Sequence, residues 1–466
     1  MHQIKKRHGI RGLLRGIEMI LEIVLFCVLY YAVWREGYDS DAFYFKGKYV
    51  LTGVYALLIL IMFSNLDGFL FDQRRALDLT LGQTIGLFLV NFITYFQLCL
   101  IANHMISPLP ILYLFAGEFI LAVGLIFIFK KIYHRLYAPH SLLLVYGSDN
   151  AVSLKIKMDE RKDKYNIKKL ISVDEGMEAV CKELEGYDGV IFNDLPAQFR
   201  NDLLKYCYQR DIRTYIVPKI SDILVRGGKN INLFDTPLIH IKQTGISLPQ
   251  RIIKRLMDIV FSAIILILAS PILLGVAIAI KLEDGGDVFY KQRRMTLGGK
   301  EFDILKFRSM IQDAEKLSGA VLSAGENDPR ITKVGKFVRA TRLDEIPQFI
   351  NILKGDMSIV GPRPERRVFV EEFCEKMPEF AYRMKVKGGL TGYAQIYGKY
   401  NTSPYDKLRL DLMYIENYSL QLDIKLIILT IKIIFSKEST EGEELAEINR
   451  KKTEALLEEL RKKKDS

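Results

Sequence analysis

The chain has 466 residues, of which 49% are hydrophobic, and it carries a formal net charge of +11. This length accommodates two or three domains, each with a sizeable core. The hydrophobic residues gather in long runs, which indicates a membrane protein. Beside such runs, the positive charge suits anionic lipid headgroups or phosphorylated substrates better than nucleic acid. Five scattered cysteines without a CxxC pair indicate reduced thiols facing the cytosol and exclude disulfide or zinc spacing.

The N-terminal region contains four apolar runs, each near the roughly 20 residues that cross a bilayer core. Basic residues precede the first run, lie between the second and third, and follow the fourth, so the positive-inside rule predicts four transmembrane helices with cytoplasmic ends. No small-residue cleavage site follows the first run, so we expect no cleaved signal peptide. The alternative is a set of buried helices in a soluble core. The runs cover residues 17–34, 49–66, 84–102 and 111–129 of a membrane domain at 1–135.

Residues 141–242 alternate between strand and helix patterns, which predicts a small Rossmann-like α/β domain. The first strand, at 142–146, leads into Gly147, but the GxGxxG fingerprint of dinucleotide-binding turns is missing. We therefore expect no dinucleotide cofactor here. A regulatory or oligomerisation domain is the interpretation that we favour.

A further apolar run at 256–280 follows a basic segment and is interrupted by Ser270 and Pro271. Proline removes one backbone hydrogen bond and bends a helix, while a neighbouring serine hydroxyl can satisfy the freed carbonyl. Two interpretations are open: a kinked fifth transmembrane helix, or a re-entrant helix that breaks in the inner leaflet and returns to the cytosolic side.

The C-terminal region begins with two strand patterns, at 288–294 and 300–310, around a glycine turn, which predicts a β-hairpin. The apolar stretch at 422–435 is too short to span a bilayer, so we expect an amphipathic helix in the membrane interface. The charged end at 437–466 carries a sparse apolar stripe. A solvated helical tail is the favoured interpretation and a coiled-coil contact the alternative.

Asp344 and Glu345, the acidic pair, lie at the predicted start of a helix that ends at Gly355. Arg339 precedes the pair, and Arg363 follows it between two prolines that stiffen a turn. Two carboxylates among fixed guanidinium groups suit phosphate and a divalent cation. Taken alone, an acidic pair at a helix start also serves to complement the helix dipole, and Lys306 and Arg339 alone read as solvated surface charges.

Four sequence blocks stand in order in the C-terminal region: KFRSM at 306–310, DEIPQ at 344–348, GDMSIVGPRP at 355–364 and LTGYAQ at 390–395. Together they carry a resemblance to the bacterial sugar transferase family, whose members are polyprenyl-phosphate sugar-1-phosphate transferases that begin the assembly of lipid-linked surface glycans. The similarity runs from about residue 251 to 435, and the preceding region resembles the larger members. It implies a catalytic α+β domain at 251–436 with a re-entrant helix at 252–281, since a straight crossing would separate the domain from cytosolic nucleotide-sugars.

The resemblance also implies a reaction in which Asp344 attacks the sugar-bearing phosphorus of a UDP-sugar, expels UMP and passes the phosphosugar to undecaprenyl phosphate. It implies Mg²⁺, with Glu345 as its ligand or as the group that positions the acceptor phosphate. Lys306 is implied as an active-site residue that neutralises phosphate, Arg339 and Arg363 as phosphate-binding residues, and Arg308 as a weaker candidate. The implied location is the bacterial inner membrane, with the catalytic domain in the cytosol, and a homo-oligomer is left open.

Two features qualify this interpretation. Gly388 and Gly389 stand where the family commonly has Pro-Gly, which predicts a looser turn, and Glu365-Arg366 resembles members that use hexoses such as glucose or galactose. An alternative class is a membrane-anchored oxidoreductase or epimerase, against which the missing glycine fingerprint and the missing Tyr-xxx-Lys pair of the middle domain argue. Another is a non-catalytic scaffold, which would not need to keep the acidic pair.

Overall fold

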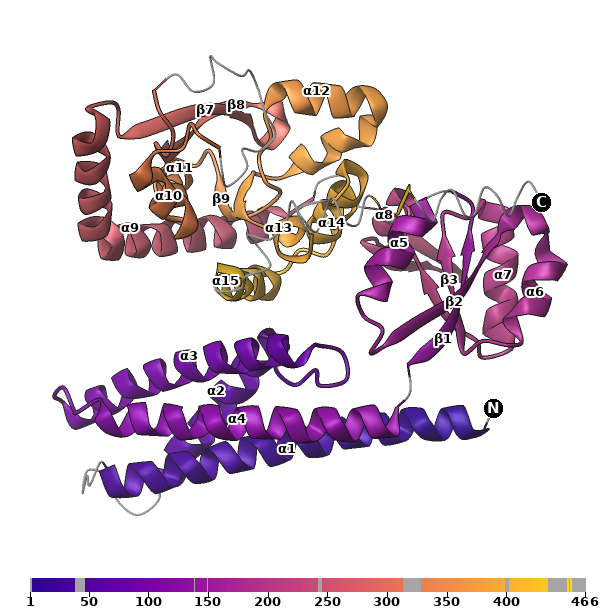
Figure 1. The fold of residues 1–466 in the computed structure, drawn as a ribbon, viewed down its shortest axis with the longest axis horizontal. Coiled ribbons are helices and arrows are strands. Elements are labelled where there is room, and N and C mark those ends of the chain that lie inside the picture. Colours follow the sequence, from indigo (N-terminus) through magenta and orange to yellow (C-terminus); the bar gives the residue numbers. More distant parts are fainter. Residues whose placement is uncertain are drawn as a thin grey trace. The chain divides into compact units, whose positions relative to one another are not determined.

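The structure is a computed structural model that describes residues 2–37, 47–137, 139–148, 150–241, 245–312, 328–398, 402–434, 451 and 453–454. Its contacts divide the chain into two units, Met1–Tyr215 and Ile216–Ser466. The first unit contains a helical bundle and a parallel sheet, and the second contains a mixed α/β domain (Figure 1).

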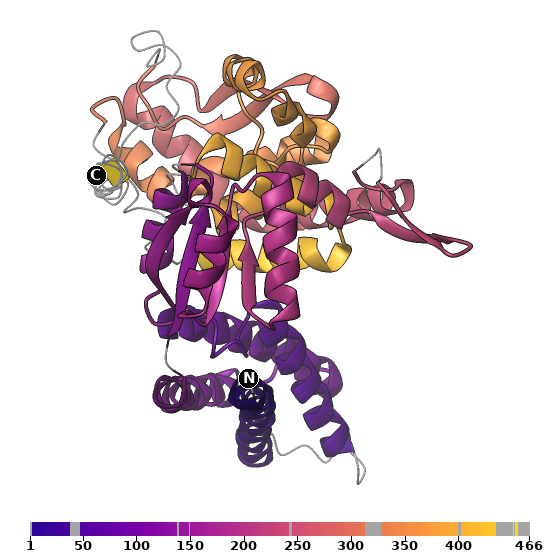
Figure 2. The ribbon, with the colours of Figure 1, turned by 90° about the vertical axis from the view of Figure 1, so that its right-hand side faces the viewer.

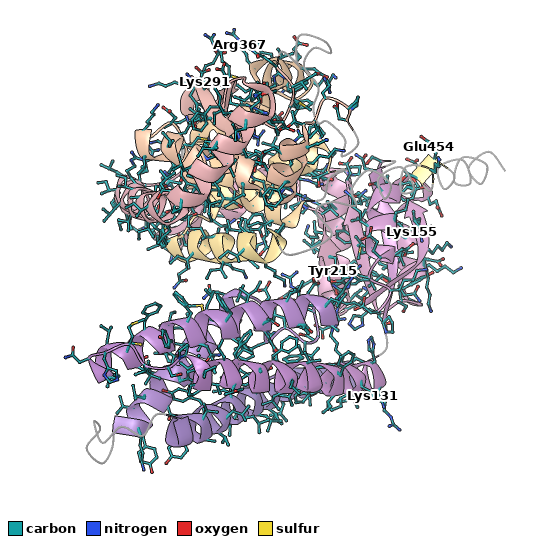
Figure 3. All side chains as sticks on the ribbon, turned by 60° about the vertical axis from the view of Figure 1, so that its left-hand side comes forward. Lys131, Lys155, Tyr215, Lys291, Arg367 and Glu454 are labelled. Atoms are coloured by element: carbon teal, nitrogen blue, oxygen red, sulfur yellow. The ribbon has the colours of Figure 1, made fainter. Side chains whose placement is uncertain are left out.

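Four long helices open the first unit and confirm the four predicted apolar helices. They bury aromatic side chains such as Phe26, Tyr55 and Phe63, while their outer faces expose apolar side chains such as Leu100, as expected of helices surrounded by lipid. Lys131, near the end of α4, points away from the bundle (Figure 3). The helices are α1 (His2–Gly37), α2 (Gly47–Asn65), α3 (Ala76–Ala102) and α4 (Leu109–Leu136), each long and apolar enough to cross a membrane.

The middle region forms a four-stranded sheet in the order β2-β1-β3-β4, in which β1 pairs in parallel with β2 and β3. Residues 142–145 of β1 are buried, which explains the unbroken apolar run of that strand. Helices flank the sheet (Figures 1 and 2). The elements are β1 (His140–Tyr146), α5 (Asn150–Asp159), β2 (Tyr165–Ser172), η1 (Val173–Glu175), α6 (Met177–Leu184), β3 (Gly189–Asn193), α7 (Ala197–Gln209) and β4 (Arg213–Ile216).

The segment after β4 belongs to the second unit, although the sequence analysis placed everything up to residue 242 in the middle domain. It comprises α8 (Ile220–Arg226) and the hairpin of β5 (Lys229–Leu233) and β6 (Thr236–His240). Ile223 is buried in the core of the C-terminal domain, and Arg409 donates a hydrogen bond to the carbonyl of Pro218 at 3.1 Å. These contacts attach α8 to the C-terminal domain.

The C-terminal domain surrounds a core that includes Ile352, Val360, Phe380 and Leu412. The predicted hairpin is confirmed as antiparallel β7 (Phe289–Met295) and β8 (Glu301–Phe307), joined by η2 (Leu297–Gly299). The remaining elements are α9 (Leu248–Asp284), α10 (Lys333–Ala340), η3 (Leu343–Glu345), α11 (Gln348–Lys354), β9 (Ser358–Val360), α12 (Arg367–Lys376), η4 (Pro378–Lys385), β10 (Gly389–Thr391), α13 (Tyr393–Tyr397), α14 (Pro404–Glu416) and α15 (Leu420–Ile434). Strand β9 pairs in parallel with β10.

Helix α9 is a fifth apolar helix long enough to cross a membrane, and it contains Pro271. Figure 1 shows a sharp turn along it, so that it has two arms. Because Pro271 has no N–H, the carbonyl four residues earlier, at Ile267, loses its helical donor. The hydroxyl of Ser270 donates to that carbonyl at 2.7 Å, as the sequence predicts.

The two predicted elements at the C-terminus differ in outcome. Helix α15 confirms a short apolar helix close to the predicted range, and it leaves Leu420 and Ile424 partly exposed. The predicted tail at 437–466 lies almost wholly outside the described residues. Its helical character and the coiled-coil alternative therefore stay predictions.

Candidate active site

The acidic pair lies in the 3₁₀ turn η3, directly before α11, and not in the first turn of that helix as predicted. Pro347 accounts for the difference, because it has no N–H to continue an α-helical ladder back to Leu343. The carbonyl of Leu343 accepts instead from the N–H of Ile346 at 3.2 Å. Gly355 ends α11 with φ of +98°, which confirms the predicted stop.

Glu345 is held by two cationic side chains. A guanidinium nitrogen of Arg363 donates to its Oε1 at 2.8 Å, and the Lys306 ammonium lies 3.6 Å from the same oxygen. Burial alone would raise the pKa of Glu345, but Arg363 and Lys306 outweigh burial and hold the pKa well below its usual range. Glu345 is therefore ionised at neutral pH.

Asp344 has a different environment, although it is the next residue. Its Oδ1 is buried and has no hydrogen-bond partner within the described part of the chain. Burial, and after it the charge of Glu345, raises the pKa of Asp344, while Lys306 and Arg339 oppose the rise. The two carboxylates thus differ: Glu345 is bound by two cations, whereas the buried Oδ1 of Asp344 has no hydrogen-bond partner among the described residues.

Lys306 lies on β8, opposite Tyr290 of β7, and burial lowers its pKa while Glu345 opposes the shift. Arg308 lies beyond the end of β8 and binds elsewhere: both terminal nitrogens contact the carboxylate of Asp284, one of them at 2.6 Å, and its Nε donates to the Asp287 carbonyl. The structure thus brings Lys306, Arg363 and the acidic pair together but leaves Arg308 apart from them.

The turn that carries Arg363 is fixed by two arginines that the sequence analysis missed. Arg383 donates to the carbonyl of Arg363 at 2.9 Å, and Arg294 donates to the carbonyl of Pro364 at 3.2 Å. Both arginines also lie near the Glu365 carboxylate. Arg294 stands in the KQRR run of the hairpin and Arg383 in η4, so no local spacing linked them to the turn.

Gly388 and Gly389 do not form the looser turn that the sequence analysis predicts. The N–H of Gly388 donates to the Thr296 hydroxyl at 3.0 Å, a bond that proline could not make. The carbonyl of Gly388 accepts from the N–H of Ser358 at 2.9 Å. A Cβ on Gly389 would lie 2.1 Å from the backbone nitrogen of Gly361, so this position requires glycine.

The acidic pair fits Mg²⁺ only as a partial ligand set. No group of three or more His, Cys, Asp or Glu side chains that could hold a metal occurs within the residues that the structure describes. Mg²⁺ commonly takes one or two protein carboxylates and completes its shell with waters and substrate phosphates. The carboxylate of Glu345 suits that arrangement as one protein ligand.

The fold and the site together define a membrane-associated α/β domain with an acidic pair among cationic side chains. The family model described as bacterial sugar transferase matches residues 249–437. The UDP-glucose:undecaprenyl-phosphate glucose-1-phosphate transferase of Caulobacter vibrioides is 38% identical over 191 residues. These residues cover 40% of this chain and 71% of that protein. The chain belongs to the bacterial sugar transferase family.

Two further relatives match this chain over a smaller share of their own length. The UDP-N-acetylgalactosamine-undecaprenyl-phosphate N-acetylgalactosaminephosphotransferase of Aeromonas hydrophila is 40% identical over 54% of this chain and 59% of that protein. The UDP-glucose:undecaprenyl-phosphate glucose-1-phosphate transferase of Escherichia coli is 39% identical over 46% of this chain and 47% of that protein. The matches span about half the length of these two relatives.

Proposed function

We propose that the chain transfers a sugar-1-phosphate from a UDP-sugar to undecaprenyl phosphate and releases UMP, and so begins the assembly of an exopolysaccharide, capsule or O-antigen. Family membership and the names of the relatives support this reaction. The names differ in the sugar, N-acetylgalactosamine in one and glucose in the other. A hexose-1-phosphate is the first candidate for the transferred group.

The different surroundings of the two carboxylates are the main support for a covalent intermediate. A nucleophilic carboxylate needs a free oxygen, and Asp344 has one, whereas Glu345 is engaged by Arg363 and Lys306. Asp344 is therefore the nucleophile. Glu345 keeps both cations in place, and it remains the candidate ligand for Mg²⁺ or the group that positions the acceptor phosphate.

The reaction then has two displacements at one phosphorus. An Asp344 oxygen bonds to the sugar-bearing phosphorus while the phosphorus–oxygen bond to UMP breaks. An oxygen of undecaprenyl phosphate next bonds to the same phosphorus, and the bond to Asp344 breaks, which restores the carboxylate. Lys306, Arg339 and Arg363 neutralise phosphate charge. Bound Mg²⁺ would spread the charge that develops on the phosphate oxygens.

The contacts of α9 support a re-entrant helix. In its first arm, Lys254 bonds to Asp423 at 2.6 Å. In its second arm, Val276 and Ile280 pack in one cluster with Phe307 of β8. A crossing helix would place its ends on opposite sides of the membrane, but both arms of α9 bind one domain. We therefore place that domain on the cytosolic side of the bacterial inner membrane.

The middle sheet domain keeps a regulatory or oligomerising role in this proposal, and a homo-oligomer stays open. The fingerprint glycines are missing after β1. We accordingly expect no dinucleotide in this domain.

The experiment that tests the proposal is UMP release from a panel of UDP-sugars with Mg²⁺ in the absence of any lipid acceptor. With the matching donor, the wild type should release close to one UMP per active site in a burst, and undecaprenyl phosphate should convert the burst into turnover. Asp344→Asn should abolish the burst, with a rate loss of at least about 10³-fold, because the amide is not a nucleophile.

Asp303→Asn is the matched control, because the Asp303 side chain is 57% exposed on β8 and should leave the burst intact. UMP release that occurs only when lipid is present would contradict the covalent intermediate but keep the transferase. No release from any donor by folded protein would contradict the transferase itself.

A further inference from the structure

Helix α14 places a carboxylate in the core of the C-terminal domain. Leu408, Leu412 and Ile415 lie on the buried apolar face of this helix. Asp411 follows the same helical spacing and is 1% exposed. A charge at such a position costs stability unless a partner compensates it, and apolar side chains would often serve a core as well or better. Packing alone therefore does not explain Asp411.

The partner of Asp411 is Arg383, which is itself buried in η4. Its Nη2 lies 2.8 Å from Oδ2 of Asp411 and donates to the carbonyl of Arg363 at 2.9 Å. Burial raises the pKa of Asp411 and the adjacent Arg383 opposes the rise, so the charge of Asp411 depends on this contact. The side chain of Arg363 in turn donates to Glu345. One guanidinium thus connects α14 with the turn whose arginine binds the acidic pair.

A second carboxylate competes for Arg383. Glu365 lies 3.8 Å from Nη1 of Arg383, and it also pairs with Lys407 at 2.9 Å. Asp411 is the nearer of the two carboxylates to Arg383. If Asp411 lost its charge, we expect the guanidinium to be drawn toward Glu365, which would weaken its bond to the carbonyl of Arg363.

The turn of Arg363 is not closely packed on the side of Arg383. A cavity of about 20 Å³ is lined by residues 362–365 of the turn and by Arg383. Contacts across a gap contribute little attraction, so packing does not fix the turn there. The hydrogen bond from Arg383 therefore has a large share in setting the position of the turn.

We propose that Asp411 is a positioning residue that acts through Arg383 on the turn of Arg363. In this position the turn brings the guanidinium of Arg363 to Glu345. The effect on the reaction rests on the proposed function, but the effect on the turn does not. A displacement of about 1 Å in an active site can slow a reaction about 100-fold. Loss of Asp411 should therefore slow the first displacement by about this factor.

The test compares Asp411→Asn with the double variant Asp411→Leu and Arg383→Met, each as full-length protein in lipid nanodiscs. Apolar replacement of a buried ion pair is often neutral or stabilising, so the double variant should unfold at or above the wild-type temperature. At saturating UDP-sugar, both variants should release UMP in a burst about 100-fold slower than that of the wild type. The burst amplitude should still match the amount of folded protein. A pair that only stabilises the fold predicts the wild-type burst rate in the double variant, and that result would overturn the proposal.

Hydrogen exchange provides a readout that does not depend on activity. The amides of Arg363 and Glu365 should exchange faster in both variants, and unchanged exchange would also overturn the proposal. Ile223→Ala is the matched control, because it removes a buried side chain of α8 from the same core. It should lower the unfolding temperature but leave the burst rate and the exchange of the turn at their wild-type values. If the turn responds to Asp411→Asn although no UDP-sugar releases UMP, the proposed transferase fails and the positioning of the turn stands.

Discussion

Asp344 and Glu345 are adjacent in sequence, yet their surroundings act on their charges in opposite directions. Arg363 and Lys306 stabilise the ionised form of Glu345, whereas burial disfavours the ionised form of Asp344. A pKa that differs between the folded and unfolded protein changes the free energy of unfolding. Removal of the Glu345 charge should therefore lower the stability of the fold, and removal of the Asp344 charge should raise it.

Glu345→Gln should destabilise the protein by about 3 kcal/mol at neutral pH, because Arg363 and Lys306 would be left without their counter-ion. The depressed pKa of Glu345 contributes stability above the ordinary glutamate range, and this contribution is lost as pH falls toward the lower folded value. Thermal unfolding from about pH 7 down to about pH 2 should therefore show a deficit of the variant that is constant above the ordinary glutamate range and shrinks with acid below it. An equal deficit at every pH would contradict this account.

Asp344→Asn should raise the unfolding temperature while it abolishes activity. The pKa of Asp344 is raised in the folded protein, so its ionised form costs stability above that pKa, and the cost disappears as pH falls below the ordinary aspartate range. The gain should be about 1 kcal/mol near pH 8 and vanish in acid. Asp303→Asn, at an exposed carboxylate, should show no such gain.

At the scale of elements, the sequence predicts most of the helices and strands. The hairpin β7–β8 and the first strand of the middle sheet appear close to their predicted ranges, and each predicted apolar run lies almost wholly within one of the long helices. Arg308 shows where pattern reasoning fails. Two residues beyond Lys306, it would share the face of Lys306 if β8 continued, but the strand ends at Phe307 and Arg308 binds Asp284. Likewise, the approach of Arg294 and Arg383 to the Arg363 turn depends on tertiary packing, which no spacing encodes.

The re-entrant arrangement of α9 can be tested by labelling its two ends. Leu248 and Leu282 are 71% and 80% exposed near the start and end of the helix. In a variant without the native cysteines, Leu248→Cys and Leu282→Cys should both react with a membrane-impermeant maleimide added from the cytosolic side of inverted vesicles. Ile267→Cys, 72% exposed near the bend, should be protected because it lies in the membrane. Labelling of the two ends from opposite sides would establish a crossing helix.

At the scale of the whole molecule, the second unit has a core of its own, and the family match lies within it. A fragment that begins at residue 216 should therefore remain membrane-bound and release UMP from the matching donor. A fragment that begins at residue 245 should have a free energy of unfolding about 2–4 kcal/mol lower than the fragment from residue 216, because it lacks the buried side chain of Ile223. Equal stability of the two fragments would show that α8 adds nothing to this unit.

Docking of both arms of α9 onto one domain has a consequence for how the two substrates meet. If α9 is re-entrant, as we propose, a domain attached at two points to this helix can neither leave the membrane surface nor rotate on it. The donor then arrives through three dimensions of solution, while the acceptor arrives through two, by lateral diffusion within the leaflet. In the proposed reaction, the rate of acceptor capture is governed by the number of acceptor lipids per unit area of membrane, not by their number per volume of cell.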